Sequence, residues 1–133
     1  MRILIDTDVL LDVALAREPH VAASAGVLEW AEAGGEAAVA WHSLTNLGYL
    51  LKGGRPFLKH LLQLVEVPAT GTQDATRALE SPMPDLEDAF QVAAALVWKA
   101  DFIVTRNLSD YRKSPIPALS PTQFLTRSGE RGL

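Results

Sequence analysis

The chain of 133 residues contains no cysteine. This absence excludes disulfide bonds, thiolate metal sites and cysteine nucleophiles. Long apolar runs are also missing, because no segment approaches the ~20 consecutive apolar residues that a membrane-spanning helix needs. Positive charge is scarce, since 12 Lys and Arg stand against 16 Asp and Glu, for a net charge of -4. This balance argues against a protein that wraps nucleic acid by bulk positive charge, but it allows a metal enzyme that gathers carboxylates at one site.

The composition is that of one globular domain. Hydrophobic residues make up 48% of the chain and charged residues 21%, which is enough for one packed core. Asp6, Asp8 and Asp12 interrupt the apolar start, so the layout of a secretory signal is missing. We therefore expect a cytoplasmic protein without a membrane partner, with a single domain over residues 1–127 and a flexible tail over residues 128–133.

Strand and helix signals alternate along the chain. Apolar runs predict buried strands at residues 2–5, 37–41 and 102–104, with shorter ones at 65–68 and 116–119. Helical patterns follow at residues 9–17, 20–33, 43–51, 56–64, 72–79, 86–100 and 122–126. Asp8 and Ser43 are the predicted N-caps of the first and third helices. Strands separated by helices predict an α/β fold, a three-layer α/β/α sandwich with a central, mainly parallel sheet.

Acidic and small polar side chains stand at predicted strand ends and at one helix start. Asp6 directly follows the first apolar strand, and ligands of open α/β sheets bind at that edge. Asp85 and Asp88 are three residues apart at a helix start, so they face the same side. A further group follows a later strand and consists of Thr105, Asn107 and Asp110. Two strand ends and one helix start can converge on one pocket.

Clustered carboxylates favour a bound cation, because like charges raise each other's pKa. Oxygen ligands of this kind suit Mg²⁺ or Mn²⁺. Such an ion can lower the pKa of a bound water and stabilise charge on a phosphate. The pattern therefore indicates metal-assisted hydrolysis of a phosphodiester.

Each acid also has a structural interpretation. Asp8 is expected to cap a helix rather than bind metal. Asp85 is balanced between an N-cap and a ligand, and Glu87 is expected to face solvent. The polar residues after the last long strand can equally hold their loop by hydrogen bonds. Asp6 is harder to explain structurally, because a carboxylate directly after a buried strand needs partners.

A set of motifs runs through the chain in the order LIDTDVLLD, SLTNLGYLL, DLEDAFQVAAAL, FIVTRNLSDY and IPALSPTQFL. Together they resemble the PIN domain, the nuclease fold of VapC-type toxins, in the branch with Thr-Asn in the second motif. The likeness extends from residue 2 to residue 126. It implies a parallel α/β/α sandwich, a Mg²⁺ or Mn²⁺ site, single-strand-directed ribonuclease activity, an antitoxin partner and a homodimer. It also implies that Asp6, Asp88 and Asp110 form the acidic site, with Thr105 and Asn107 in the last motif.

The second motif departs from the family pattern. Many PIN nucleases carry a glutamate there, whereas this chain has Asn46. Asn46 can coordinate a cation through its carbonyl oxygen but brings no charge. The hypothesis is that Asp85 or Glu87 compensates for the missing charge.

Three alternatives stay open. The Asp-x-Asp pattern of Asp6 and Asp8 also resembles the start of haloacid-dehalogenase-type phosphatases, which need a later lysine that follows no strand here. A receiver domain needs a phosphoacceptor aspartate after a middle strand, and residues 65–70 contain none. The strongest alternative is a PIN fold that binds RNA or a protein without cleavage, because Asn46 weakens the site.

Basic and aromatic residues give weaker predictions about RNA. Arg106 and Arg112 flank the last motif and are the basic residues best placed to meet a substrate. The basic residues around Gly53 are expected to form a solvated helix face. Trp41 and the other two tryptophans, Trp30 and Trp98, are expected in the core rather than under stacked bases.

Overall fold

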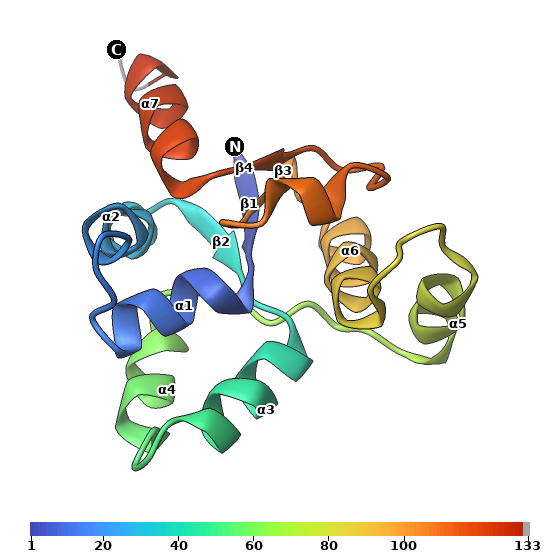
Figure 1. The fold of residues 1–133 in the computed structure, drawn as a ribbon, viewed down its shortest axis with the longest axis horizontal. Coiled ribbons are helices and arrows are strands. Elements are labelled where there is room, and N and C mark those ends of the chain that lie inside the picture. The colour runs from blue at the N-terminus through green and yellow to red at the C-terminus, as the bar shows by residue number, and fades with distance from the viewer. Residues whose placement is uncertain (132–133) are drawn as a thin grey trace.

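The computed structural model describes residues 1–131 and shows strands interleaved with helices (Figure 1). The strands are β1 (Arg2–Ile5), β2 (Glu36–Ala38), β3 (Phe102–Val104) and β4 (Ala118–Leu119). The helices are α1 (Thr7–Ala14), α2 (Val21–Glu32), α3 (Trp41–Leu50), α4 (Arg55–Leu61), α5 (Thr72–Glu80), α6 (Leu86–Trp98) and α7 (Pro121–Arg131), with a 3₁₀ helix η1 (Leu108–Tyr111). In this part of the chain, no helix has the length and apolar character to cross a membrane.

The strands form one parallel sheet in the order β2-β1-β3-β4. Leu4 pairs with Ala38 on one side and with Ile103 on the other. Because all the strands are parallel, their carboxyl ends lie at one edge. The predicted strand at 65–68 is reduced to a single bridge between Glu66 and Ala38, so that part of the prediction is wrong.

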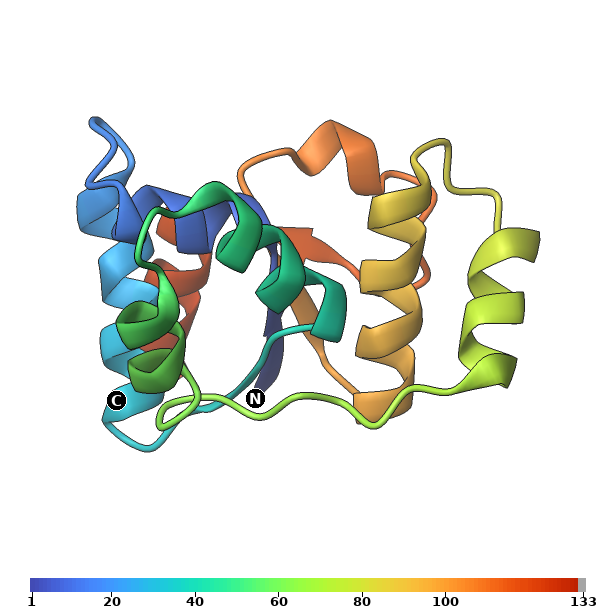
Figure 2. The ribbon, with the colours of Figure 1, turned by 90° about the horizontal axis from the view of Figure 1, so that it is seen from below.

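Alternating side chains of β1 bury both faces of the sheet. Ile3 and Ile5 belong to the core shared with α1, α2, α3, α4 and α7. Leu4 belongs to the opposite core, which the alanine-rich helix α6 dominates. Figure 2 shows the sheet between these two groups of helices, with α5 outside α6. The three-layer α/β/α prediction is confirmed.

Two helices begin earlier than the sequence predicts. Asp6, not Asp8, is the N-cap of α1, and its Oδ1 accepts the Thr7 N–H at 2.7 Å. Asp6 is extended as β1 ends, which is the conformation that an N-cap requires. Ser43 is not the N-cap of α3. The helix begins at Trp41, and Ser43 is buried within its first turn. Asp85 is the N-cap of α6, and its Oδ1 accepts the Asp88 N–H at 3.0 Å.

The last helix is longer than predicted. Residues 128–131, expected in a flexible tail, continue α7, while residues 132–133 of that tail lie outside the described residues. Phe124 anchors the helix because it is fully buried and meets Trp30 edge to face, with ring centroids 4.9 Å apart. The polar sequence after residue 126 carries no apolar signal of this helix, which is why the prediction stopped early.

The tryptophans divide between core and surface. Trp30 is partly buried and packs against the core. Trp98 packs against the other core and donates from Nε1 to Glu66 Oε2 at 2.7 Å. Trp41 is 65% exposed, so its predicted place in the core is wrong.

Candidate active site

An open cleft of about 440 Å³ lies at the carboxyl edge of the sheet, where Asp6 follows β1. Its polar lining consists of Asp6, Thr7, Asp8, Asn46, Asp85, Glu87, Asp88, Asn107 and Asp110. Thr105 is fully buried and donates its hydroxyl to Asp6 Oδ2 at 2.9 Å. The structure therefore brings the sequence-predicted site residues to one place. We call this site the acidic cleft.

Asp6 is the most constrained acid of the cleft, with an exposed fraction of 6%. Its Oδ1 accepts the Gln91 Nε2 amide at 3.1 Å in addition to the Thr7 N–H. Its Oδ2 accepts the hydroxyls of Thr105 at 2.9 Å and Tyr111 at 3.0 Å. Burial raises the pKa of Asp6, and these hydrogen bonds oppose that rise. The carboxylate is thus held in one orientation.

Asp88 shares a hydroxyl with Asp6. The Tyr111 hydroxyl lies 3.2 Å from Asp88 Oδ1 as well as 3.0 Å from Asp6 Oδ2. Burial raises the pKa of Tyr111, so the hydroxyl keeps its proton. One proton cannot be donated to two carboxylates, so both contacts are satisfied together when one carboxyl is protonated. Burial and then the charge of Asp6 raise the pKa of Asp88 to about 7, so Asp88 carries a proton over part of the neutral range.

Asp8 connects α1 to the loop after β3. Its Oδ2 accepts the Arg106 N–H at 3.1 Å and the Asn107 Nδ2 amide at 2.9 Å. Its Oδ1 is buried and has no hydrogen-bond partner among the described residues. Burial and then the charge of Asp6 raise the pKa of Asp8 to about 6. Asp8 therefore positions the loop of Asn107 instead of capping a helix.

Asn46 and Glu87 meet across the cleft, from α3 to α6. The Asn46 Nδ2 amide donates to Glu87 Oε1 at 2.8 Å. Glu87 is exposed in the first turn of α6, as expected, and it also accepts this hydrogen bond at the cleft. Asn46 of the second motif is neutral, but this hydrogen bond holds the Glu87 carboxylate of the third motif beside it.

Two positioning residues of the cleft were missed at the sequence level. Gln91 is fully buried, and its Nε2 donates to Ser43 Oγ at 2.8 Å as well as to Asp6. The sequence contained a signal for Gln91. This residue is a lone amide in an apolar helix, and it stands three residues after Asp88, so the two share one face of the helix. Tyr111 gave no such signal, because it meets Asp6 only through the tertiary fold.

A buried ion-pair network lies behind the cleft. Asp12 is fully buried, and its Oδ1 accepts Arg17 Nε at 3.0 Å. Its Oδ2 accepts Arg106 Nε at 2.6 Å and the Ser24 hydroxyl at 3.2 Å. Asp12 thus joins α1, α2 and the loop after β3. Since the Arg106 N–H also contacts Asp8, this network fixes the loop that faces the cleft.

The cleft was tested for its fit to a divalent metal ion. Within residues 1–131, no three Asp, Glu or His side chains already stand in the arrangement of a metal site. The donor set nevertheless fits Mg²⁺ or Mn²⁺, because carboxylate oxygens of Asp6, Asp88 and Asp110 line one cleft. Burial and then the charges of Asp6 and Asp85 raise the pKa of Asp88, and a bound cation would relieve the repulsion among these acids.

Metal removal is expected to make stability depend on pH. The folded pKa values of Asp88, about 7, and Asp8, about 6, lie above the ordinary aspartate value. Their stabilising contribution is therefore complete below the unfolded pKa and is lost as the pH rises through 6 and 7. With a chelator, we expect the free energy of unfolding to fall by about 1–2 kcal/mol between about pH 5 and pH 8, after allowance for solvent screening.

Urea denaturation at a series of pH values measures this change. Asp88→Asn is expected to remove most of the slope, and saturating Mn²⁺ is expected to reduce it in the wild-type protein. A chelated wild-type protein with a flat or rising profile over the same range would contradict the assignment.

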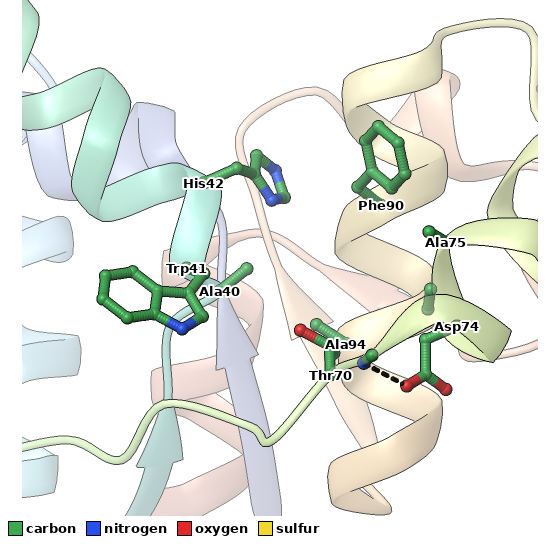
Figure 3. A pocket seen from close by; sticks show the side chains of 10 residues that line it. Ala40, Trp41, His42, Thr70, Asp74, Ala75, Phe90 and Ala94 are labelled. Carbon is green, nitrogen blue, oxygen red and sulfur yellow. Dashed lines mark hydrogen bonds between the residues drawn. The ribbon is translucent and has the colours of Figure 1, made fainter.

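An apolar pocket of about 300 Å³ lies apart from the acidic cleft, between the start of α3, α5 and α6. Figure 3 shows His42 from α3 and Phe90 from α6 among the side chains that line it, and their ring centroids are 6.0 Å apart. Burial lowers the pKa of His42, whose Nε2 has no hydrogen-bond partner in the described part of the chain. None of the sequence-predicted site residues lines this pocket, so the acidic cleft is the candidate site.

Comparisons with known proteins identify the family and the fold. The sequence model of the PIN domain matches residues 2–109. No curated protein matches the chain.

Similar solved structures include VapBC2 from Rickettsia felis bound to a DNA fragment from their promoter, with a TM-score of 0.70 and 15% identity over 90% of this chain and 98% of that one. A toxin-antitoxin complex from Klebsiella pneumoniae has a TM-score of 0.64 and 21% identity, over 89% and 96% of the two chains. FitAcB from Neisseria gonorrhoeae has a TM-score of 0.55 and 15% identity, over 90% and 98%. At these identities the likeness shows the fold alone.

Proposed function

The chain belongs to the PIN domain family, and from this premise we propose that it is a metal-dependent endoribonuclease that hydrolyses single-stranded RNA. One observation carries the proposal: Asp6, Asp88 and Asp110, which come from separate parts of the sequence, line one cleft at the carboxyl edge of the sheet. We propose Mg²⁺ or Mn²⁺ as the cofactor. We further propose that the protein is the cytoplasmic, homodimeric toxin of a toxin–antitoxin pair.

Residues of the cleft divide into ligands and positioning groups. Asp6 and Asp88 would hold the ion, Asp110 would bind it or orient a water, and Asp85 would add charge nearby. When bound, the ion supplies a water of lowered pKa and stabilises negative charge on the phosphate. Other side chains hold these groups in place by hydrogen bonds. Asp6 accepts from Thr105, Gln91 and Tyr111. Asn46 donates to Glu87.

The same contacts indicate which groups of the cleft carry a proton. Tyr111 keeps its hydroxyl proton and donates it toward Asp6 Oδ2. Asp88 carries a proton over part of the neutral range, since its pKa is about 7. Binding of a cation would favour the ionised carboxyl, so Asp88 would release this proton as the ion enters.

An antitoxin partner is proposed from both the fold and the surface of the cleft. The similar solved structure from Klebsiella pneumoniae is a toxin-antitoxin complex. Beside the acids, the cleft has an apolar rim that includes Tyr49, 90% exposed, and Leu50, 57% exposed. An antitoxin segment with apolar residues for this rim and an Arg or Lys for the acids would fit both surfaces.

The alternative is a PIN fold that binds RNA or protein without cleaving RNA. Asn46 favours it, because this neutral residue replaces an acid in the second motif. The hydrogen bond to Glu87 favours the nuclease instead, since it keeps a carboxylate beside Asn46.

Incubation of a labelled single-stranded RNA pool with Mn²⁺ or Mg²⁺ tests the proposal. We expect cleavage with either ion, none with excess chelator, and recovery when Mn²⁺ exceeds the chelator. A duplex of the same sequence is the matched control and should be cut far more slowly. RNA that is bound but never cut would establish the non-cleaving alternative, and cutting that survives chelation would contradict the metal requirement.

A further inference from the structure

A polar pocket of about 260 Å³ lies on the other side of Arg106 from the acidic cleft. Its polar lining includes Ser24, Arg106, Ser120 and Thr122. The pocket shares the carboxyl edge of the sheet with the cleft, because Arg106 follows β3 and Ser120 follows β4, as Asp6 follows β1. A strand of nucleic acid that crosses this edge would meet both.

The Arg106 guanidinium supplies the positive charge of the pocket lining. The guanidinium groups of Arg17 and Arg106 share the single carboxylate of Asp12. Among the hydrogen bonds of residues 1–131, the Arg106 guanidinium uses only Nε, and its side chain is 26% exposed where it lines the pocket. Its terminal nitrogens are therefore available donors.

The first turn of α7 adds little to this charge, because it is already capped. The Ser120 N–H donates to Gln123 Oε1 at 2.9 Å, and the Gln123 N–H donates to Ser120 Oγ at 3.1 Å. The Ser24 hydroxyl is also engaged, because it donates to Asp12. The binding capacity of the pocket thus depends on the Arg106 guanidinium, with the Ser120 and Thr122 hydroxyls and the His20 imidazole in the same lining. A forked guanidinium with hydroxyl neighbours matches the oxygens of a phosphate group.

We propose that this pocket binds a backbone phosphate of the RNA, adjacent to the phosphodiester that enters the acidic cleft. The inference rests on the proposed function. Arg106 connects the two sites directly, because its main-chain N–H contacts Asp8 in the cleft and its side chain lines the pocket. Phosphate contacts fix the register of a nucleic acid without reading its sequence. Arg106 and its pocket therefore set which bond of a bound strand lies over the acids.

Thr122 offers a test that leaves the buried network intact. It is exposed on the pocket wall, whereas replacement of Arg106 would disturb its ion pair with Asp12. A fluorescently labelled single-stranded RNA of about 12 nucleotides is bound in the presence of chelator, and its anisotropy is followed at several salt concentrations. We expect Thr122→Glu to weaken binding about three- to ten-fold at low salt and Thr122→Lys to strengthen it by a similar factor, with both effects shrinking as salt rises.

Gln73 provides a matched control. It is exposed in the first turn of α5, which lies on the far side of the molecule from α7 (Figure 1). Gln73→Glu and Gln73→Lys make the same charge changes and are expected to alter the affinity by less than about two-fold. Equal affinities for wild type and both Thr122 variants would overturn the proposal, as would equal shifts from the Gln73 pair. RNA that binds with the expected shifts but is never cut would support the phosphate pocket and contradict the nuclease.

Discussion

Asp6→Asn is expected to lower the rate of metal-dependent RNA cleavage by on the order of a thousand-fold, because it removes a charged ligand from the proposed metal site. The fold should tolerate the change. The Thr105 and Tyr111 hydroxyls, which donate to Asp6 Oδ2, can rotate to accept from an amide in its place. Single-turnover cleavage of a labelled RNA at saturating Mn²⁺ measures the loss, and circular dichroism confirms the fold.

Three further substitutions define which acids matter. Asp88→Asn is expected to cause a loss similar to that of Asp6→Asn. Asp85→Asn preserves an N-cap for α6, so we expect near-normal cleavage at saturating Mn²⁺ but a higher Mn²⁺ requirement if Asp85 adds charge to the site. Asp101→Asn is the matched control, since Asp101 is exposed and precedes β3 at the opposite edge of the sheet. Wild-type cleavage by Asp6→Asn and Asp88→Asn would refute the assignment of the active site.

Asp12→Ala is expected to lower the free energy of unfolding by about 3–5 kcal/mol, which is a large part of the stability of an ordinary domain. The substitution removes the carboxylate that pairs with both the Arg17 and the Arg106 guanidinium groups, and it also leaves the buried Ser24 hydroxyl without its acceptor. Urea denaturation in the presence of Mn²⁺ measures the difference.

A surface ion pair is the control for the Asp12 substitution. Arg2 and Glu36 form an ion pair in which the Glu36 side chain is 58% exposed. Glu36→Ala is expected to cost less than about 1 kcal/mol, because solvent screens the pair. If Asp12→Ala costs no more than Glu36→Ala, the buried network does not stabilise the protein as argued.

Much of the fold was predictable because its signals are local. The apolar run before Asp6 and the run at residues 102–104 are buried strands, and helices lie between them as expected. The acids of the cleft were predictable for a related reason. Parallel strands bring their carboxyl ends to one edge, so residues that follow different strands must meet there.

The remaining features depend on contacts between distant segments. The Tyr111 hydroxyl meets Asp6 across 105 residues of sequence, and no local pattern encodes such a contact. Trp41 was expected in the core because of its apolar ring, but its place at the start of α3 leaves it exposed. The α1 cap was misplaced by two residues, because Asp6 alone separates the end of β1 at Ile5 from the start of α1 at Thr7.

The double role of Asp6 affects how relatives of this protein should be interpreted. Asp6 directly follows β1, caps α1 and accepts hydrogen bonds from three buried side chains, so a descendant that had lost catalysis would still be under selection to keep it. Asp110 is exposed, and among the described residues its carboxylate accepts no hydrogen bond. Genetic drift would therefore erase Asp110 long before Asp6, and an intact Asp110 is the more informative mark of a working enzyme.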